Sequence, residues 1–193
     1  IESVEDYDKL YECIGKETID EQAVDTLKKF LGTNCNRIVV EYPYHDKDFL
    51  STYYCYYSQK FRGFPKKCYR LHIMGEDEKY FGYIVLRPTV KGTRLGTTYL
   101  SPQPFLDEEA YLMLAKYEAH IMDNKCDIMC FPWMKQEVDI AVCAHVAAWT
   151  ILRYYGNKYH NYADTTMGAI AQKIKGDMGR KTPSNGLTPV QIA

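Results

Sequence analysis

The sequence has no excess of charge of either sign, because 24 Lys and Arg residues stand against 25 Asp and Glu residues. A protein that binds nucleic acid or an anionic membrane surface through charge needs a surplus of basic residues. The sequence also has no apolar run near the roughly 20 residues that a membrane-spanning helix needs. Its acidic start has no apolar signal-peptide core. We therefore expect neither nucleic acid nor a membrane as a partner.

A dense, even set of cysteines is missing as well. The chain has seven cysteines at irregular spacings, whereas secreted disulfide frameworks usually contain an even number at high density. We therefore predict a reducing, cytoplasmic location. Cys126 and Cys130 lie four positions apart, but no Cys or His pair nearby has zinc-finger spacing. We expect no metal and no other cofactor.

The front of the chain mixes helical and strand patterns. Hydrophobic residues make up 46% of the 193 residues, which is enough for one large domain or two small ones. The segment 18–31 predicts a helix, since its apolar residues share one face and Gly32 can end it. RIVVEY, at 37–42, is rich in β-branched residues and predicts a strand. The segment 46–59 fits either a helix or a tyrosine-rich strand.

Residues 68–131 have the pattern of successive strands. Asp123 and Asn124 supply hairpin-turn chemistry between the last two of them. A helix competes for 110–122, because Ala, Leu, Met and Lys are good helix formers. From about residue 132 the pattern becomes helical, with an expected buried stripe on a helix that ends at Gly156. That stripe consists of Val142, Val146, Trp149, Ile151 and Leu152.

A polar stretch that begins at Gln136 runs into this apolar helix, with Cys143 at the junction. A cysteine acts as a nucleophile only as a thiolate, and the positive end of a helix macrodipole favours that anion. Gln136, seven residues upstream, could donate its amide to an oxyanion, with the Cys143 backbone N–H as a second donor. Such donors contribute roughly 3 to 4 kcal/mol to acyl-transfer chemistry.

The run from Gln136 through Cys143 to LRYYG, with the RYYGNKYHNYAD and GRKTPSNGLTPVQI that follow, resembles papain-like cysteine peptidases. The similarity is to the catalytic-cysteine region of the bacteriocin-leader-processing branch and its uncharacterised bacterial relatives, and it covers residues ~130–193. The resemblance implies Cys143 as nucleophile and Gln136 in the oxyanion hole of a bacterial hydrolase that cleaves a peptide or isopeptide bond. It implies a cysteine-bearing helix packed on an antiparallel sheet that supplies His and Asn or Asp.

The predicted fold class is α+β, divided into two domains. Residues 1–122 would form a mixed α/β accessory domain with antiparallel strands, for recognition of a protein or peptide substrate. Residues 123–193 would form the N-terminal, helical part of a papain-like peptidase domain. The family's His and Asn or Asp follow the cysteine at a distance that places them after Ala193.

No histidine of the chain has a pattern that directs it toward the thiol. His145 follows Cys143 by two residues, which is about 200° around a helix, so it should point away. The others are His45, His72, His120 and His160.

The last residues specify the start of a helix. Thr188 can cap it, Pro189 suits its first position and Gln191 completes a capping box. We therefore expect the chain to be the front part of a longer protein, and this part alone to be inactive.

Two other interpretations remain open. The chain could be a non-catalytic binding or scaffold module that keeps a papain-like fold. Alternatively, the strand and glycines at 82–96 could belong to an acyltransferase-like front domain, which would bind coenzyme A. The tyrosines between 53 and 57 could form a protein-binding surface, although half-buried packing is the simpler account.

Overall fold

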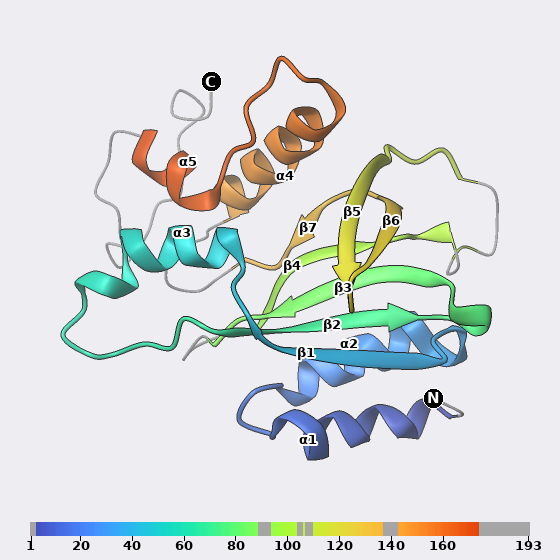
Figure 1. Cartoon of the computed structure of the whole chain (residues 1–193). Helices are drawn as coiled ribbons and strands as arrows, with labels where there is room; N and C mark the ends of the chain where they lie inside the picture. Colours follow the sequence, from blue (N-terminus) through green and yellow to red (C-terminus); the bar gives the residue numbers. More distant parts are fainter. Residues whose placement is uncertain (1–2, 89–93, 104–105, 107–109, 137–142, 174–193) are drawn as a thin grey trace.

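The computed structural model describes the chain except for residues 1–2, 89–93, 104–105, 107–109, 137–142 and 174–193. The described residues combine helices with antiparallel sheets, which confirms the α+β class (Figure 1). The larger sheet has the strand order β1-β2-β3-β4-β7, and β5 pairs with β6 in a separate hairpin. In chain order the elements are η1 Val4–Asp8, α1 Lys9–Ile14, α2 Glu21–Leu31, η2 Gly32–Asn34, β1 Arg37–Tyr44, α3 Lys47–Cys55, η3 Tyr57–Gln59, β2 Cys68–Met74, η4 Glu76–Glu78, β3 Tyr80–Leu86, β4 Leu95–Leu100, β5 Ala115–Ile121, β6 Asn124–Cys130, β7 Trp133–Met134, α4 Cys143–Lys158 and α5 Met167–Lys173.

Helices α1 and α2 cover one face of the larger sheet (Figure 1). Leu10 and Leu27 from these helices join Leu71 and Leu86 from the strands in one buried cluster. Asp20 caps α2 by accepting a hydrogen bond from the backbone N–H of Ala23 at 2.7 Å. The helix expected at 18–31 is therefore confirmed over a slightly shorter range. We did not predict α1, whose six residues are too few to display a helical period.

Helices α3, α4 and α5 and the β5–β6 hairpin lie on the opposite side of this sheet (Figure 1). The segment 46–59, which fitted two patterns, forms α3 and a short 3-10 turn. Tyr53 and Tyr57 are buried there against Phe49, and Tyr54 is exposed. Two of the four tyrosines between residues 53 and 57 are therefore core residues, and a protein-binding surface there stays a prediction.

The predicted hairpin is present, with its turn one position earlier than expected. β5 and β6 pair from Ala115 opposite Cys130 to Ile121 opposite Asn124. The two turn residues are Met122 and Asp123, both with positive φ. Residues 115–121 form a strand and not the competing helix, since alternate side chains are buried along it.

The boundary predicted between residues 122 and 123 falls within this two-residue turn. Beyond it, β7 still pairs with β4 of the larger sheet. The division into two domains stays a prediction. Among the described residues, none of the helices is both long and apolar enough to cross a membrane.

Candidate functional site

The two residues singled out from the sequence meet at the start of α4. Cys143 is the first residue of this helix, and its thiol is exposed. Gln136 follows β7 and is exposed as well. The Cys143 Sγ donates a hydrogen bond to Oε1 of Gln136 at 2.8 Å. The intervening residues 137–142 lie outside the described part of the chain.

The backbone that carries Gln136 is anchored to the larger sheet. β7, which ends two residues earlier, pairs with β4. Arg87, buried just after β3, donates from Nη2 to the carbonyl oxygens of Leu95 at 2.9 Å and of Lys135 at 3.0 Å. These bonds fix the residue directly before Gln136. No local pattern in the sequence pointed to Arg87, because its partner lies 48 positions away.

Helix α4 is anchored by a buried carboxylate from α3. Asp48 Oδ1 accepts hydrogen bonds from Trp149 Nε1 at 2.9 Å and from the backbone N–H of Met167 at 3.3 Å. Arg153 Nη2 donates to both oxygens of Asp48, at 2.9 and 2.8 Å. Asp48 is 1% exposed and Arg153 is 4% exposed. The Asp48 carboxylate therefore joins α3 to α4 through an ion pair and to the start of α5 through a backbone hydrogen bond.

The buried face of α4 differs from the predicted stripe. Trp149 is fully buried and Val146 packs beside it, as expected. Ile151 and Leu152 are instead exposed, at 52% and 38%. The predicted Val142 lies outside the described residues. Arg153 lies four positions after Trp149, on the same buried face of the helix, whereas Ile151 and Leu152 lie outside that face.

Two buried carboxyl groups at the start of α3, those of Asp46 and Asp48, have raised pKa values. Asp46 caps the helix by accepting from the backbone N–H of Phe49 at 2.8 Å, and is 4% exposed. Desolvation, reinforced by the nearby charge of Asp48, raises the pKa of Asp46 to about 6. Desolvation also raises the pKa of Asp48, and Arg153 opposes this rise.

Among the described residues, no histidine forms a hydrogen bond with Cys143. His145 is half-buried, its Nδ1 has no partner in the described part of the chain, and burial lowers its pKa. His72 is buried on β2, where its two ring nitrogens meet Tyr80 Oη at 2.8 Å and Glu41 Oε2 at 3.1 Å. It is a structural residue of the sheet. The remaining histidines, His45, His120 and His160, are exposed.

The described residues contain no group of three His, Cys, Asp or Glu side chains that could hold a metal ion. Cys126 and Cys130 both lie on β6, and Cys130 is fully buried. The glycine segment of the acyltransferase interpretation lies partly outside the described residues, at 89–93.

No known family model, curated protein or solved structure matches this chain. An exposed thiol beside a side-chain amide at the start of a helix suits nucleophilic attack on a carbonyl and stabilisation of the resulting oxyanion.

Proposed function

We propose that the chain carries the cysteine-bearing part of a papain-like cysteine hydrolase, which cleaves a peptide or isopeptide bond. The observation that carries the proposal is the 2.8 Å hydrogen bond between the Cys143 thiol and Gln136. A buried packing cysteine would have neither the exposure nor this polar partner.

In the proposed reaction, the Cys143 sulfur attacks the substrate carbonyl carbon while its proton passes to an imidazole. The carbonyl oxygen becomes an oxyanion, which accepts hydrogen bonds from the Cys143 backbone N–H and from Gln136 Nε2. Collapse of this intermediate expels the amine, which takes the proton back from the imidazolium. Water then hydrolyses the thioester and restores the thiol.

Two requirements follow from the geometry. The side-chain amide of Gln136 presents its oxygen to the thiol, so a half-turn of the amide must bring Nε2 to the oxyanion. The reaction also requires an imidazole at the thiol, and among the described residues none of the five histidines forms a hydrogen bond with Cys143.

The test is competitive alkylation with iodoacetamide near pH 6, with the labelled cysteines mapped by mass spectrometry. Cys13 is the control, since it is also exposed but lies near the end and not at the start of its helix. We expect Cys143 to react at least about tenfold faster than Cys13, as an activated thiol should.

The same experiment tests the rival interpretation, a binding module without chemistry. That interpretation is favoured by the lack of a histidine at the thiol. It predicts that Cys143 and Cys13 react at similar rates, and appreciably only above about pH 8. Such a result would reject the hydrolase.

A further inference from the structure

A polar hollow lies between strands β3, β4 and β5 and helix α4. Its volume is about 470 Å³, which lies within the roughly 300–1,000 Å³ of small-molecule sites. Tyr83 of β3, Tyr99 of β4 and Tyr117 of β5 line it, and Arg153 of α4 lines it as well. Since Arg153 follows Cys143 by ten positions, the hollow lies roughly 15 Å along the helix from the thiol. It is therefore separate from the candidate site at Cys143.

The three tyrosines form a row of contacting rings beside the hollow. The ring centroids of Tyr83 and Tyr99 lie 5.2 Å apart, and those of Tyr99 and Tyr117 lie 4.7 Å apart. A tyrosine offers an apolar ring together with a hydroxyl that forms hydrogen bonds. The row therefore suits a ligand that has both C–H surfaces and polar groups.

Two of these tyrosines have hydroxyl groups that the protein does not use. Among the described residues, neither Tyr83 Oη nor Tyr99 Oη forms a hydrogen bond, although Tyr83 is half-buried and Tyr99 is only 5% exposed. Tyr117 differs, because its hydroxyl donates to the Arg153 carbonyl oxygen at 3.3 Å. Since a buried hydroxyl without a partner is unfavourable, the two free hydroxyls call for hydrogen-bonding groups inside the hollow.

The charged side chains of the hollow are matched. Each of the three cations and two carboxylates that line it has a partner of opposite charge. The pairs are Lys47 with Asp164, Arg153 with Asp48 and Asp164, Lys116 with Asp127, and Glu118 with Lys125. A charged ligand would have to compete with these pairs, whereas an uncharged ligand leaves them intact.

We infer that this hollow binds an uncharged, polyhydroxylated ligand of monosaccharide size. Each sugar hydroxyl can both donate and accept a hydrogen bond, as the hydroxyls of Tyr83 and Tyr99 can. The C–H groups of the sugar ring pack on the tyrosine rings. Asn157 Nδ2 donates to the Lys116 carbonyl oxygen, which leaves the Asn157 side-chain oxygen for a ligand hydroxyl. The inference does not depend on the chemistry proposed for Cys143.

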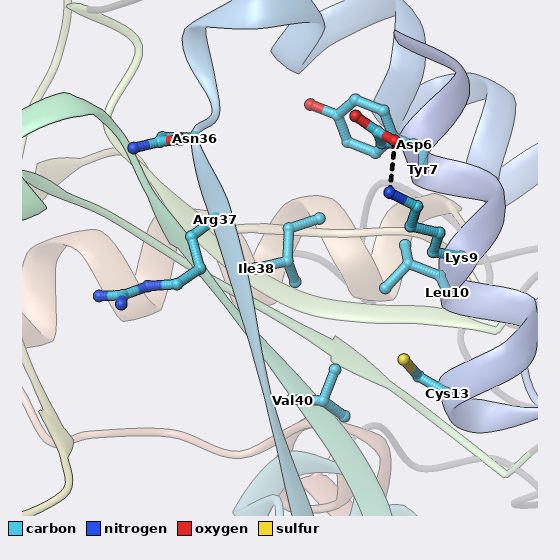
Figure 2. A pocket seen from close by; sticks show the side chains of 9 residues that line it. All are labelled: Asp6, Tyr7, Lys9, Leu10, Cys13, Asn36, Arg37, Ile38 and Val40. Carbon is cyan, nitrogen blue, oxygen red and sulfur yellow. Dashed lines mark ion pairs between the residues drawn. The ribbon is translucent and has the colours of Figure 1, made fainter. Parts of the chain in front are cut away.

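A hollow of about 420 Å³ between α1 and β1 has a different lining. Leu10 of α1 and Ile38 and Val40 of β1 supply apolar side chains to it (Figure 2). Tyr7 lines it too, but the Tyr7 hydroxyl already donates to the Gly32 carbonyl oxygen at 2.8 Å. This second hollow therefore serves as an internal control for unspecific binding.

The test is a titration of the isotopically labelled whole chain with glucose, galactose and mannose, followed through backbone amide resonances by nuclear magnetic resonance. We expect at least one sugar to shift the resonances of Tyr83, Tyr99 and Tyr117 in a saturable way. The resonances of Leu10 and Ile38, at the other hollow, should stay unchanged.

The methyl glycoside of the sugar that binds distinguishes two sources of the same chemistry. Equal binding of the glycoside supports the terminal sugar of a larger glycan as the ligand. Loss of binding supports a free monosaccharide.

The uronate and amino analogues of the same sugar test the role of charge. They keep the ring and add a carboxylate or an ammonium group. Each should bind at least about threefold more weakly than the neutral sugar, because its charge loses water and finds no unmatched partner in the hollow.

Two conservative variants test the hydroxyls. Tyr83→Phe and Tyr99→Phe each remove one hydroxyl and keep the ring, so each should weaken binding about threefold to tenfold, the effect of one hydrogen bond. Tyr54→Phe is the matched control, because Tyr54 is exposed and does not line the hollow, and its affinity should stay within about twofold. Far-ultraviolet circular dichroism verifies that each variant is folded.

Three results would overturn the inference. The first is that no sugar shifts the resonances of the hollow, which would leave water as its occupant. The second is tighter binding of a charged analogue than of the neutral sugar. The third is unchanged affinity in both Tyr83→Phe and Tyr99→Phe.

Discussion

At the scale of single residues, Asp46 is an acid held where its charge is unfavourable. Its carboxylate caps α3 and also accepts a hydrogen bond from Thr97 Oγ1 at 3.4 Å. These bonds favour the ionised form but do not offset burial, so the pKa stays raised at about 6. In an unfolded chain the pKa would be about 3.9.

Asp46 should therefore make stability fall as pH rises. Between about pH 4 and pH 6 the unfolded chain releases the proton while the folded chain keeps it, so the contribution present at low pH is lost. Asp46→Asn keeps a capping oxygen and removes the titration. The unfolding free energy of Asp46→Asn, relative to that of the unmodified chain, should rise across this pH range by at most about 3 kcal/mol.

Urea unfolding of both proteins at pH 4, 5, 6 and 7 measures this difference. Glu76→Gln, at an exposed site, is the control and should show no such trend. A constant difference between Asp46→Asn and the unmodified chain would contradict the raised pKa.

Gln136 should matter for acyl transfer and not for alkylation. Gln136→Ala removes the side-chain donor for the oxyanion, whereas alkylation by iodoacetamide forms no oxyanion. Acylation of Cys143 by p-nitrophenyl acetate should slow by about tenfold or more. This effect is smaller than the roughly 10²–10³-fold loss of kcat that follows removal of one oxyanion donor from a complete active site. Alkylation of Cys143 should stay within about twofold, since nucleophile access is unchanged.

If both reactions slowed equally, Gln136 would act on the thiol and not on the oxyanion. Gln136→Asn is the conservative variant, because it retains the amide on a shorter side chain.

The sequence indicated Cys143 and Gln136 because both lie in one short segment with a recognisable pattern. It could not indicate Arg87 or Asp48, whose partners lie 48 and about 100 positions away. Such partners meet only after the sheet and helices have packed.

At the scale of elements, the buried pair of Asp48 and Arg153 holds three helices together. Arg153→Met would leave the Asp48 carboxylate buried without a counter-charge, which should cost about 3–5 kcal/mol of unfolding free energy. Denaturant unfolding at pH 7 measures the loss.

A second variant tests whether charge is the reason. Asp48→Asn, added to Arg153→Met, removes the stranded charge but keeps an oxygen for Trp149 Nε1 and the Met167 N–H, both of which bond to Oδ1. The double variant should recover part of the lost stability. A double variant as unstable as Arg153→Met would show that packing, and not charge, dominates.

Helices and strands with a strong period were predictable, and exceptions have physical reasons. The helix at 18–31 and the strands between 68 and 131 have regular apolar patterns and clear ends. In α4, Arg153 is buried and pairs with the distant Asp48, whereas Ile151 and Leu152 are exposed. The apolar pattern of the sequence does not show that the arginine of this helix is buried and the two apolar residues are exposed.

At the scale of the whole molecule, segments on both sides of the predicted boundary share buried clusters. Tyr99 of β4 packs with Cys130 and Tyr154, and Trp149 bonds to Asp48. We therefore predict a single unfolding transition. In a Trp133→Phe variant, the fluorescence of Trp149 should change at the same denaturant concentration as the far-ultraviolet circular dichroism.

Earlier loss of the Trp149 signal would contradict this prediction and would favour two independent domains. The control is the circular dichroism transition of the unmodified chain, which should match that of Trp133→Phe. Trp133 is 46% exposed, so its replacement should lower the unfolding free energy little.

The central claim is that the start of α4 makes Cys143 a nucleophile toward carbonyls. The most direct measurement is the rate at which p-nitrophenyl acetate acylates each cysteine at pH 6, with added imidazole as the base and mass spectrometry to locate the thioester. The account predicts that Cys143 is acylated first, at least about tenfold ahead of Cys13, which is also exposed. Equal rates at the two thiols, or faster acylation of Cys13, would contradict it.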